Sequence, residues 1–103
     1  MNKIVIKQHN FKVLAWSPSP NRVTLDLGKG AEILEMRCTG CDVELFVEQE
    51  EGVENEKREL LTYKLGQAFE RPDPASYRLL GIAGAADMKA AVYERLSDYP
   101  QMI

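Results

Sequence analysis

Residues that build metal and redox centres are scarce in this chain. Among 103 residues there are one histidine, His9, and two cysteines, Cys38 and Cys41. A structural zinc ion takes four ligands, which this set cannot supply within one chain. We therefore interpret Cys38 and Cys41 as thiols of a packed strand face, with their redox state left open. We expect neither a metal nor a cofactor.

Basic charge and long apolar runs are also scarce. The chain has 13 Lys and Arg residues against 16 Asp and Glu residues, a net charge of −3. This balance argues against direct nucleic-acid binding, because such binding needs cations that neutralise phosphates. No apolar run approaches the roughly 20 residues of a membrane-spanning helix. Lys7 interrupts the short apolar N-terminus, which is not a signal peptide. We expect a cytoplasmic protein that does not bind membranes.

Recognisable catalytic patterns are missing as well. The chain has no Gly-x-Ser-x-Gly sequence, the nucleophile turn of many hydrolases. Gly28-Lys29-Gly30 lacks the spacing and the Ser or Thr of a phosphate-binding loop, so we interpret these glycines as turn residues. His9 stands without a nucleophile pattern and is expected at a surface or strand edge. We predict that the protein is not an enzyme.

The pattern that is present is alternation with period two, which is typical of strands. It predicts an all-β, mostly antiparallel sandwich of about seven or eight strands. Residues 1–96 are expected to form one domain, and residues 97–103 a flexible tail. The expected strands are Ile4–Trp16, which is one bent strand or two broken near His9-Asn10, then Val23–Leu27, Leu34–Cys38, Cys41–Val47, Leu60–Leu65 and Tyr77–Ala83.

Thr39-Gly40 is expected to be the turn of a two-residue hairpin. Such a turn would place Cys38 opposite Cys41 and bring two apolar sets to one face, unless a bulge at Gly40 shifts the pairing. The first set is Leu34, Met36 and Cys38, and the second is Cys41, Val43, Leu45 and Val47.

The last segment before the tail, residues 88–96, is ambiguous. As a helix it has Asp87 as N-cap and an apolar stripe, and its composition favours a helix slightly. As a strand it alternates Ala90 and Val92 against Ala91 and Tyr93. A long connection over Gly66–Ser76 precedes the strand Tyr77–Ala83, in which Gly81 is expected to be a bulge or a site of close backbone approach.

Three segments carry a family resemblance. Residues 25–34, Leu-Asp-Leu-Gly-Lys-Gly-Ala-Glu-Ile-Leu, describe a strand, a Lys-Gly-Ala turn and an Ile-Leu strand. Lys57-Arg58 opens a later strand, and residues 66–81 lead through Pro72-Asp73-Pro74 into Tyr77-Arg78-Leu79-Leu80. Together they resemble a family of short tailed-phage and prophage proteins, over about Phe11 to Leu96. The resemblance implies a small antiparallel sandwich that closes with a strand, and it transfers no active site.

Acidic residues mark the candidate site. Residues 48–56 are expected to be a loop without Lys or Arg, which offers a negative patch to a basic protein partner. Phe46 is expected to point away from the core, where an exposed aromatic ring can mark a protein interface. The candidate partner-binding residues are Phe46, Glu48, Glu50, Glu51, Glu54 and Glu56.

We therefore predict a non-enzymatic protein-interaction module. The resemblance implies a phage-encoded accessory protein that binds a host protein in the host cytoplasm, with host defence among the targets. One alternative is a minor virion or assembly component that self-associates through strand edges, for example as a homodimer. Another is a small-molecule-binding domain, with a pocket near residues 66–76 in which Tyr63, Tyr77 and Arg78 come first.

Overall fold

The computed structural model describes residues 3–13, 20–85 and 88–96. Within these residues every regular element is a strand, as the alternating pattern predicted. The seven strands are β1 (Ile4–Lys12), β2 (Asn21–Gly28), β3 (Glu32–Thr39), β4 (Asp42–Glu50), β5 (Asn55–Lys64), β6 (Tyr77–Ala83) and β7 (Ala90–Arg95).

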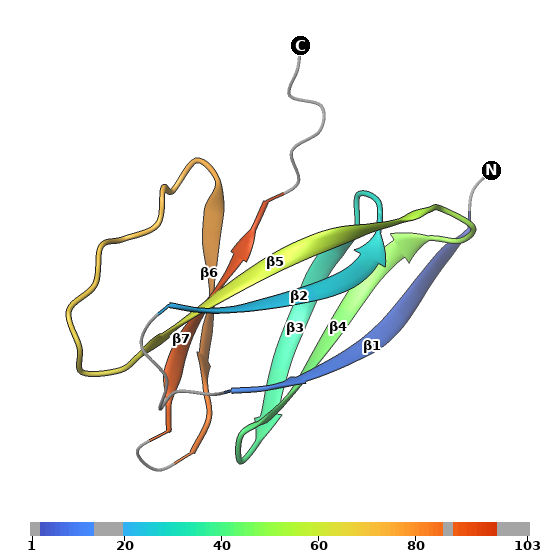
Figure 1. Cartoon of the computed structure of the whole chain (residues 1–103). Helices are drawn as coiled ribbons and strands as arrows, with labels where there is room; N and C mark the ends of the chain where they lie inside the picture. Colours follow the sequence, from blue (N-terminus) through green and yellow to red (C-terminus); the bar gives the residue numbers. More distant parts are fainter. Residues whose placement is uncertain (1–2, 14–19, 86–87, 97–103) are drawn as a thin grey trace.

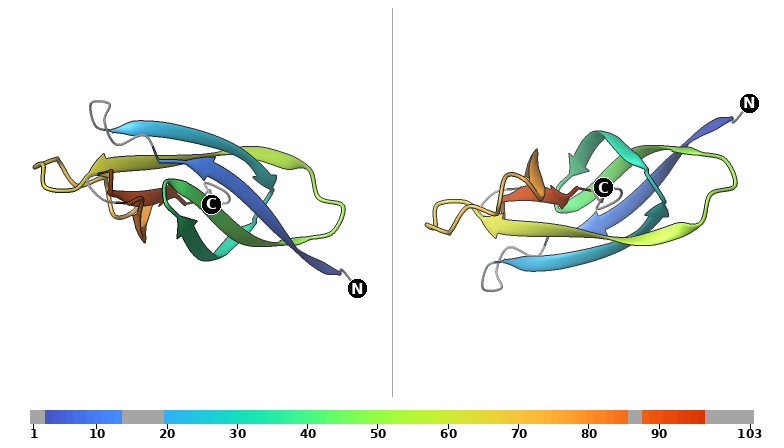
Figure 2. Two further views of the ribbon diagram at one scale, coloured as in Figure 1. Left: turned by 90° about the horizontal axis from the view of Figure 1, so that it is seen from below. Right: turned by 90° about the horizontal axis from the view of Figure 1, so that it is seen from above.

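The strands form two antiparallel sheets that pack face to face as a β-sandwich (Figures 1 and 2). One sheet has the order β1-β4-β3 and the other the order β2-β5-β7-β6. The edge strands β3 and β6 lie side by side, one from each sheet. The short connection from β4 to β5 passes the chain from the first sheet to the second. The prediction of an antiparallel sandwich is confirmed.

Apolar side chains of the two inner faces fill the space between the sheets. Leu45 and Val47 of the three-stranded sheet, and Leu27, Leu60 and Val92 of the four-stranded sheet, are completely buried. Burying a large aliphatic side chain contributes about 1.5–3 kcal/mol, so these inner faces supply much of the stability of the fold. Partly buried residues such as Phe11 and Met36 extend the core toward its rim.

The ambiguous segment before the C-terminus is a strand, so the helical alternative is wrong. β7 pairs with β5 on one side and with β6 on the other, which satisfies its backbone along both edges. Ala90, Ala91, Val92 and Glu94 are buried, although their side chains alternate between the two faces. A position buried on both faces favours the sheet over the weak helical preference of the sequence. Residues 86–87 and the expected tail, 97–103, lie outside the described residues.

The N-terminal strand is continuous. β1 runs through His9 and Asn10, which pair with Leu45 and Glu44 of β4, so the strand has no break at that point. The last part of the expected N-terminal segment, residues 14–16, lies outside the described residues.

The hairpin between β3 and β4 turns one residue later than predicted. Thr39 pairs with Asp42, so Gly40 and Cys41 form the turn and Cys38 faces Val43 instead of Cys41. Gly40 has a φ of 60°, a left-handed conformation that glycine adopts without steric cost and that two-residue hairpins require. The position of the turn is therefore set by the residue that can adopt this left-handed conformation, Gly40.

A bulge in β3 changes which side chains of that strand face the core, so the predicted apolar face is partly wrong. The register shifts between Ile33 and Glu35, so Ile33 points inward with 5% exposure and Leu34 is 47% exposed. Met36 keeps the inward direction that was predicted, opposite Leu45. One extra residue changes the face of the side chains on its N-terminal side, which simple alternation cannot reveal. Gly81 marks a second register shift, in β6, as predicted.

The predicted acidic loop is shorter than residues 48–56. β4 continues to Glu50 because Ile4 pairs with Glu50 and the Glu51 amide donates a 2.8 Å hydrogen bond to the carbonyl of Lys3. β5 begins at Asn55, which pairs with Gly28. The loop is therefore residues 51–54. Strand pairing at both ends has outweighed the polar composition that suggested a longer loop.

Replacing Gly28 by alanine tests how the two sheets meet at this end. The added Cβ would lie 2.5 Å from Nε2 of Gln49, whose Oε1 accepts a 3.1 Å hydrogen bond from the Gly28 amide. Gln49 must then move and leave a buried donor unsatisfied, at a cost of about 1–3 kcal/mol. We expect Gly28→Ala to lower the free energy of unfolding by that amount in urea titrations. In a Gln49→Ala background the same change should cost much less, and equal costs in both backgrounds would contradict this contact.

Candidate functional site

A group of three charged side chains, two of them buried, ties the two sheets together near β3 and β6. Glu94 of β7, with its side chain 3% exposed, accepts a 2.6 Å hydrogen bond from Nη2 of Arg78. Arg58 Nη1 lies 3.6 Å from the other carboxylate oxygen of Glu94, and the Arg58 side chain is 5% exposed. Glu94 thus balances the charges of two arginines from its own sheet.

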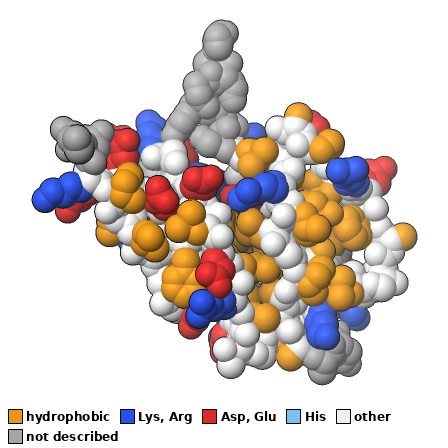
Figure 3. All heavy atoms as spheres, turned by 180° about the vertical axis from the view of Figure 1, so that it is seen from behind, with side chains coloured by type: hydrophobic (Ala, Val, Ile, Leu, Met, Phe, Trp, Pro, Cys, Tyr) orange, Lys and Arg blue, Asp and Glu red, His pale blue; other side chains and the backbone are white. Residues whose placement is uncertain are grey.

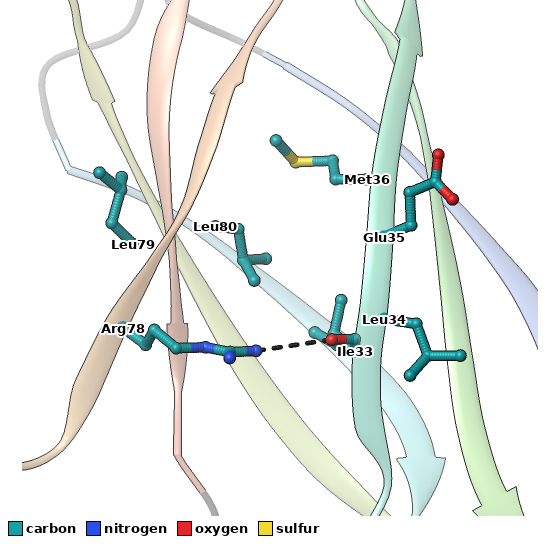
Figure 4. Close-up of a pocket in the computed structure, with 7 residues that line it drawn as sticks. All are labelled: Ile33, Leu34, Glu35, Met36, Arg78, Leu79 and Leu80. Carbon is teal, nitrogen blue, oxygen red and sulfur yellow. Dashed lines mark hydrogen bonds between the residues drawn. The ribbon is translucent and has the colours of Figure 1, made fainter.

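Both arginines also reach backbone carbonyls on the opposite side of the sandwich. Arg58 Nη2 donates a 2.8 Å hydrogen bond to the Ala31 carbonyl, just before β3. Arg78 Nη2 lies 3.5 Å from the Ile33 carbonyl, and Figure 4 shows this side chain spanning the space between β6 and β3. We call Arg58, Arg78 and Glu94 the arginine clamp. Its direct partners are protein groups on both sheets, which gives the clamp a structural role.

The outer face of the three-stranded sheet carries a surplus of negative charge. Residues opposite one another in register share a face. We call this surface the acidic face: it consists of Ile4, Ile6, Gln8, Asn10, Lys12, Glu32, Glu35, Arg37, Thr39, Asp42, Glu44, Phe46, Glu48 and Glu50. Its six carboxylates and two cations give a formal charge of −4, whereas the whole chain carries −3. The negative charge of the protein is therefore concentrated here.

Apolar side chains lie among these carboxylates. Ile4 and Ile6 are 54% and 60% exposed and lie two residues apart on the outward side of β1, where they form a small exposed apolar patch. Phe46 points outward between Gln8 and Glu35, on the face predicted for it. The guanidinium of Arg37 lies 5.5 Å from the centre of the Phe46 ring, a distance typical of a cation–π contact.

One pair of like charges on the acidic face destabilises the fold. Glu32 and Glu48 stand directly opposite each other across β3 and β4. Like charges in this position destabilise a sheet by a few tenths of a kcal/mol to about 1 kcal/mol. The protein therefore tolerates a small loss of stability at this pair.

The structure brings together some of the predicted site residues and separates others. Phe46, Glu48 and Glu50 share the acidic face. Glu51 and Glu54 are exposed in the loop beyond it. Glu56 belongs to the inner face, where its Oε2 lies 3.6 Å from Arg58 Nη2.

Sequence reasoning missed most of the acidic face. Ile4-Val5-Ile6 is a continuous apolar run, so alternation could not show which two side chains point outward. Glu32 of β3 could be assigned to this face only with the bulge at Leu34 known. Glu44 could have been assigned to this face from the sequence, because it lies between the inward-facing Val43 and Leu45.

The outer face of the four-stranded sheet carries a cluster of aromatic side chains. The loop of residues 65–76 folds back over it and buries Tyr63 to 7% exposure. The ring of Phe69 stacks on Tyr63 with centroids 4.1 Å apart, and Tyr93 meets both rings edge-on. In the view from behind, hydrophobic side chains gather on the half of the molecule where β6, β7 and this loop lie (Figure 3). On the other half, charged side chains are interspersed with them.

Beside the aromatic cluster, Tyr77 and Glu59 form a polar pair. The Tyr77 hydroxyl donates a 2.6 Å hydrogen bond to Oε1 of Glu59, and Arg22 contacts the other oxygen. The hydrogen bond from Tyr77 is the main cause that lowers the pKa of Glu59, with Arg22 adding to it. The same bond, together with burial, raises the pKa of Tyr77. Tyr77 is therefore a neutral donor at physiological pH.

The sulfur and imidazole groups do not converge. Cys38 is an exposed free thiol and Cys41 a half-buried one that packs against the core. Burial lowers the pKa of His9, and the charge of Lys7 lowers it further, so His9 is neutral near pH 7. Over the described part of the chain, no three His, Cys, Asp or Glu side chains are grouped to hold a metal. No described helix is long and apolar enough to cross a membrane.

Comparisons with known proteins add no assignment. No family model, curated protein or solved structure matches the chain. The function therefore has to be argued from the surfaces described above.

Removing the Tyr77 hydroxyl tests the polar pair. A carboxylate with a lowered pKa in the folded state stabilises the fold above its unfolded pKa, and this contribution is lost as the pH falls through the folded pKa. We expect Tyr77→Phe to raise the pKa of Glu59 toward its ordinary value of 4.5. The stability difference from wild type should be largest near neutral pH and shrink as the pH falls below that value. Urea titrations across this range would measure it.

Tyr93→Phe is the matched control, because the Tyr93 hydroxyl has no hydrogen bond to another described residue. Its effect on stability should not vary with pH in the acid range. A Tyr77→Phe difference that is equally independent of pH would show that the hydrogen bond does not hold the Glu59 carboxylate.

Proposed function

We propose that this protein is a non-enzymatic protein-interaction module whose binding surface is the acidic face. The observation that carries the proposal is the combination of Ile4, Ile6 and Phe46 with a surplus of carboxylates on one open sheet. Apolar contacts at the centre of an interface supply affinity, and complementary charges at its rim supply orientation and speed of association. The partner is a protein with an apolar centre and a basic rim.

The size of the face indicates what kind of complex it forms. Three strands of about nine residues cover roughly 30 by 15 Å. A standard interface takes about 800 Å² of accessible surface from each partner. The acidic face is smaller than that unless neighbouring loops take part, so a transient complex is favoured over a permanent one.

The resemblance to tailed-phage proteins suggests where such a partner is found. It makes a protein of the bacterial host, in the host cytoplasm, the expected target, and defence proteins belong to that class. Self-association through the acidic face is disfavoured, because two copies would bring like charges together. A virion or assembly role would need other contacts, such as the edges of the sheets.

Two charge-reversal variants test the proposal. Glu44→Lys/Glu48→Lys changes the acidic face, and Glu51→Lys/Glu54→Lys changes the adjoining loop by the same net charge. Each immobilised protein is presented to host lysate, and captured proteins are identified by mass spectrometry. We expect one dominant basic partner on wild type and on the loop variant, with at least tenfold less on the face variant. Equal capture by both variants would sink the proposal.

The single substitution Glu48→Lys separates binding from folding. It removes the like-charge pair with Glu32 and creates an opposite-charge pair in its place. We expect the free energy of unfolding in urea to rise by about 0.5–1 kcal/mol at low salt, and the gain to shrink at high salt. Partner binding should weaken in the same variant. A more stable protein that binds less cannot be explained by misfolding.

A further inference from the structure

A hollow of about 470 Å³ lies on the outer face of the four-stranded sheet, where the long loop meets β6 and β7. We call it the tyrosine hollow and define it by Arg71, Pro72, Tyr77, Arg78, Leu79 and Tyr93. It lies on the opposite side of the sandwich from the acidic face and shares no residue with it. Its volume is in the range of about 300–1,000 Å³ that is typical of small-molecule sites.

Flat and apolar groups make up the floor and one wall. Leu79 and Tyr93 are directly opposite each other in the register of β6 and β7, and Tyr77 follows on the same face of β6. Pro72 comes from the loop. Leu79 is 51% exposed, although it sits beside two aromatic rings. Such a surface offers a planar ligand both stacking and apolar contact.

The charges at the hollow are all of one sign. Arg71 and Arg78 line it, and no carboxylate is among its described lining residues. Arg71 has no hydrogen-bonding or ion-pair partner among the described residues. Arg78 adds little to this charge, because its guanidinium is paired with the buried Glu94 carboxylate on the inner face of the sheet. The guanidinium of Arg71 at an apolar hollow, in a chain of net charge −3, favours an anionic group.

Two carboxylates of the sheet beside the hollow are already engaged by groups of the protein. Glu59 is occupied by the Tyr77 hydroxyl and by Arg22. Glu94 is buried in the arginine clamp with 3% of its side chain exposed. Both of these carboxylates therefore have partners within the protein.

We propose that the tyrosine hollow binds a small organic anion with a flat aromatic body, whose carboxylate or similar group is held by Arg71. The ring system lies against Tyr77, Leu79 and Tyr93. Charge-assisted hydrogen bonds from guanidinium groups fix its orientation. The ligand class follows from the size, flatness and charge of the hollow.

Three matched probes test the ligand class: 2-naphthoate, 2-naphthalenemethanol and 2-naphthylmethylammonium. They share one ring system and differ in charge. Each is titrated into the full chain labelled with nitrogen-15, and amide shifts report both affinity and location. We expect 2-naphthoate to bind about tenfold more tightly than the alcohol and the ammonium compound to bind least. The largest shifts should fall in residues 71–79 and 93–96.

Two variants with the same change of charge test the role of Arg71. Arg71→Glu should weaken 2-naphthoate binding about tenfold. Arg37→Glu, an exposed change on the acidic face, should leave it within twofold of wild type. Both arginines are exposed, and the amide spectrum of each variant verifies that it is folded. The proposal is overturned by equal binding of all three probes, by shifts centred elsewhere, by an unchanged affinity in Arg71→Glu, or by no binding of 2-naphthoate at millimolar concentration.

Discussion

One buried carboxylate holds the sandwich closed on the side where its two sheets leave free edges. Glu94 balances Arg58 and Arg78, and each arginine also reaches a carbonyl of the chain segment at β3. Arg58, whose side chain is 5% exposed, could not be buried beside the aliphatic core without that negative charge, because an unpaired charge in an apolar interior costs several kcal/mol. The positions of β3 and β6, and therefore both outer surfaces, depend on the arginine clamp.

The two outer faces of the closed sandwich differ in chemistry because they are covered differently. The three-stranded sheet has no loop across it among the described residues, so its strands present Ile4, Ile6 and the carboxylates directly to solvent. The four-stranded sheet is partly covered by its own long loop, whose Phe69 stacks on Tyr63. One fold thus presents an open charged surface on one side and a partly covered aromatic surface on the other. The two proposals stand on different residues and can fail separately.

The sequence could predict the sandwich but only part of the candidate site. Alternation identified most strands because it records which side chains face the core, and it placed Phe46 correctly. It could not locate the bulge at Leu34, since one extra residue leaves no mark in composition. The arginine clamp joins three residues from three separate strands, two of them, Arg58 and Glu94, far apart in the sequence. Charged residues in a single sequence carry no sign of being buried, so their pairing emerges only from the strand register.

The unfolding free energy of Glu94→Gln is the most direct test of this account. The substitution keeps the shape of the side chain and removes the charge that balances Arg58 and Arg78. Glu59→Gln, on the outer face of the same sheet, is the control. The account predicts a loss of about 3–5 kcal/mol in urea titrations for Glu94→Gln and about 1 kcal/mol or less for the control. A loss at Glu94 no larger than that at Glu59 would contradict a structural dependence on the arginine clamp.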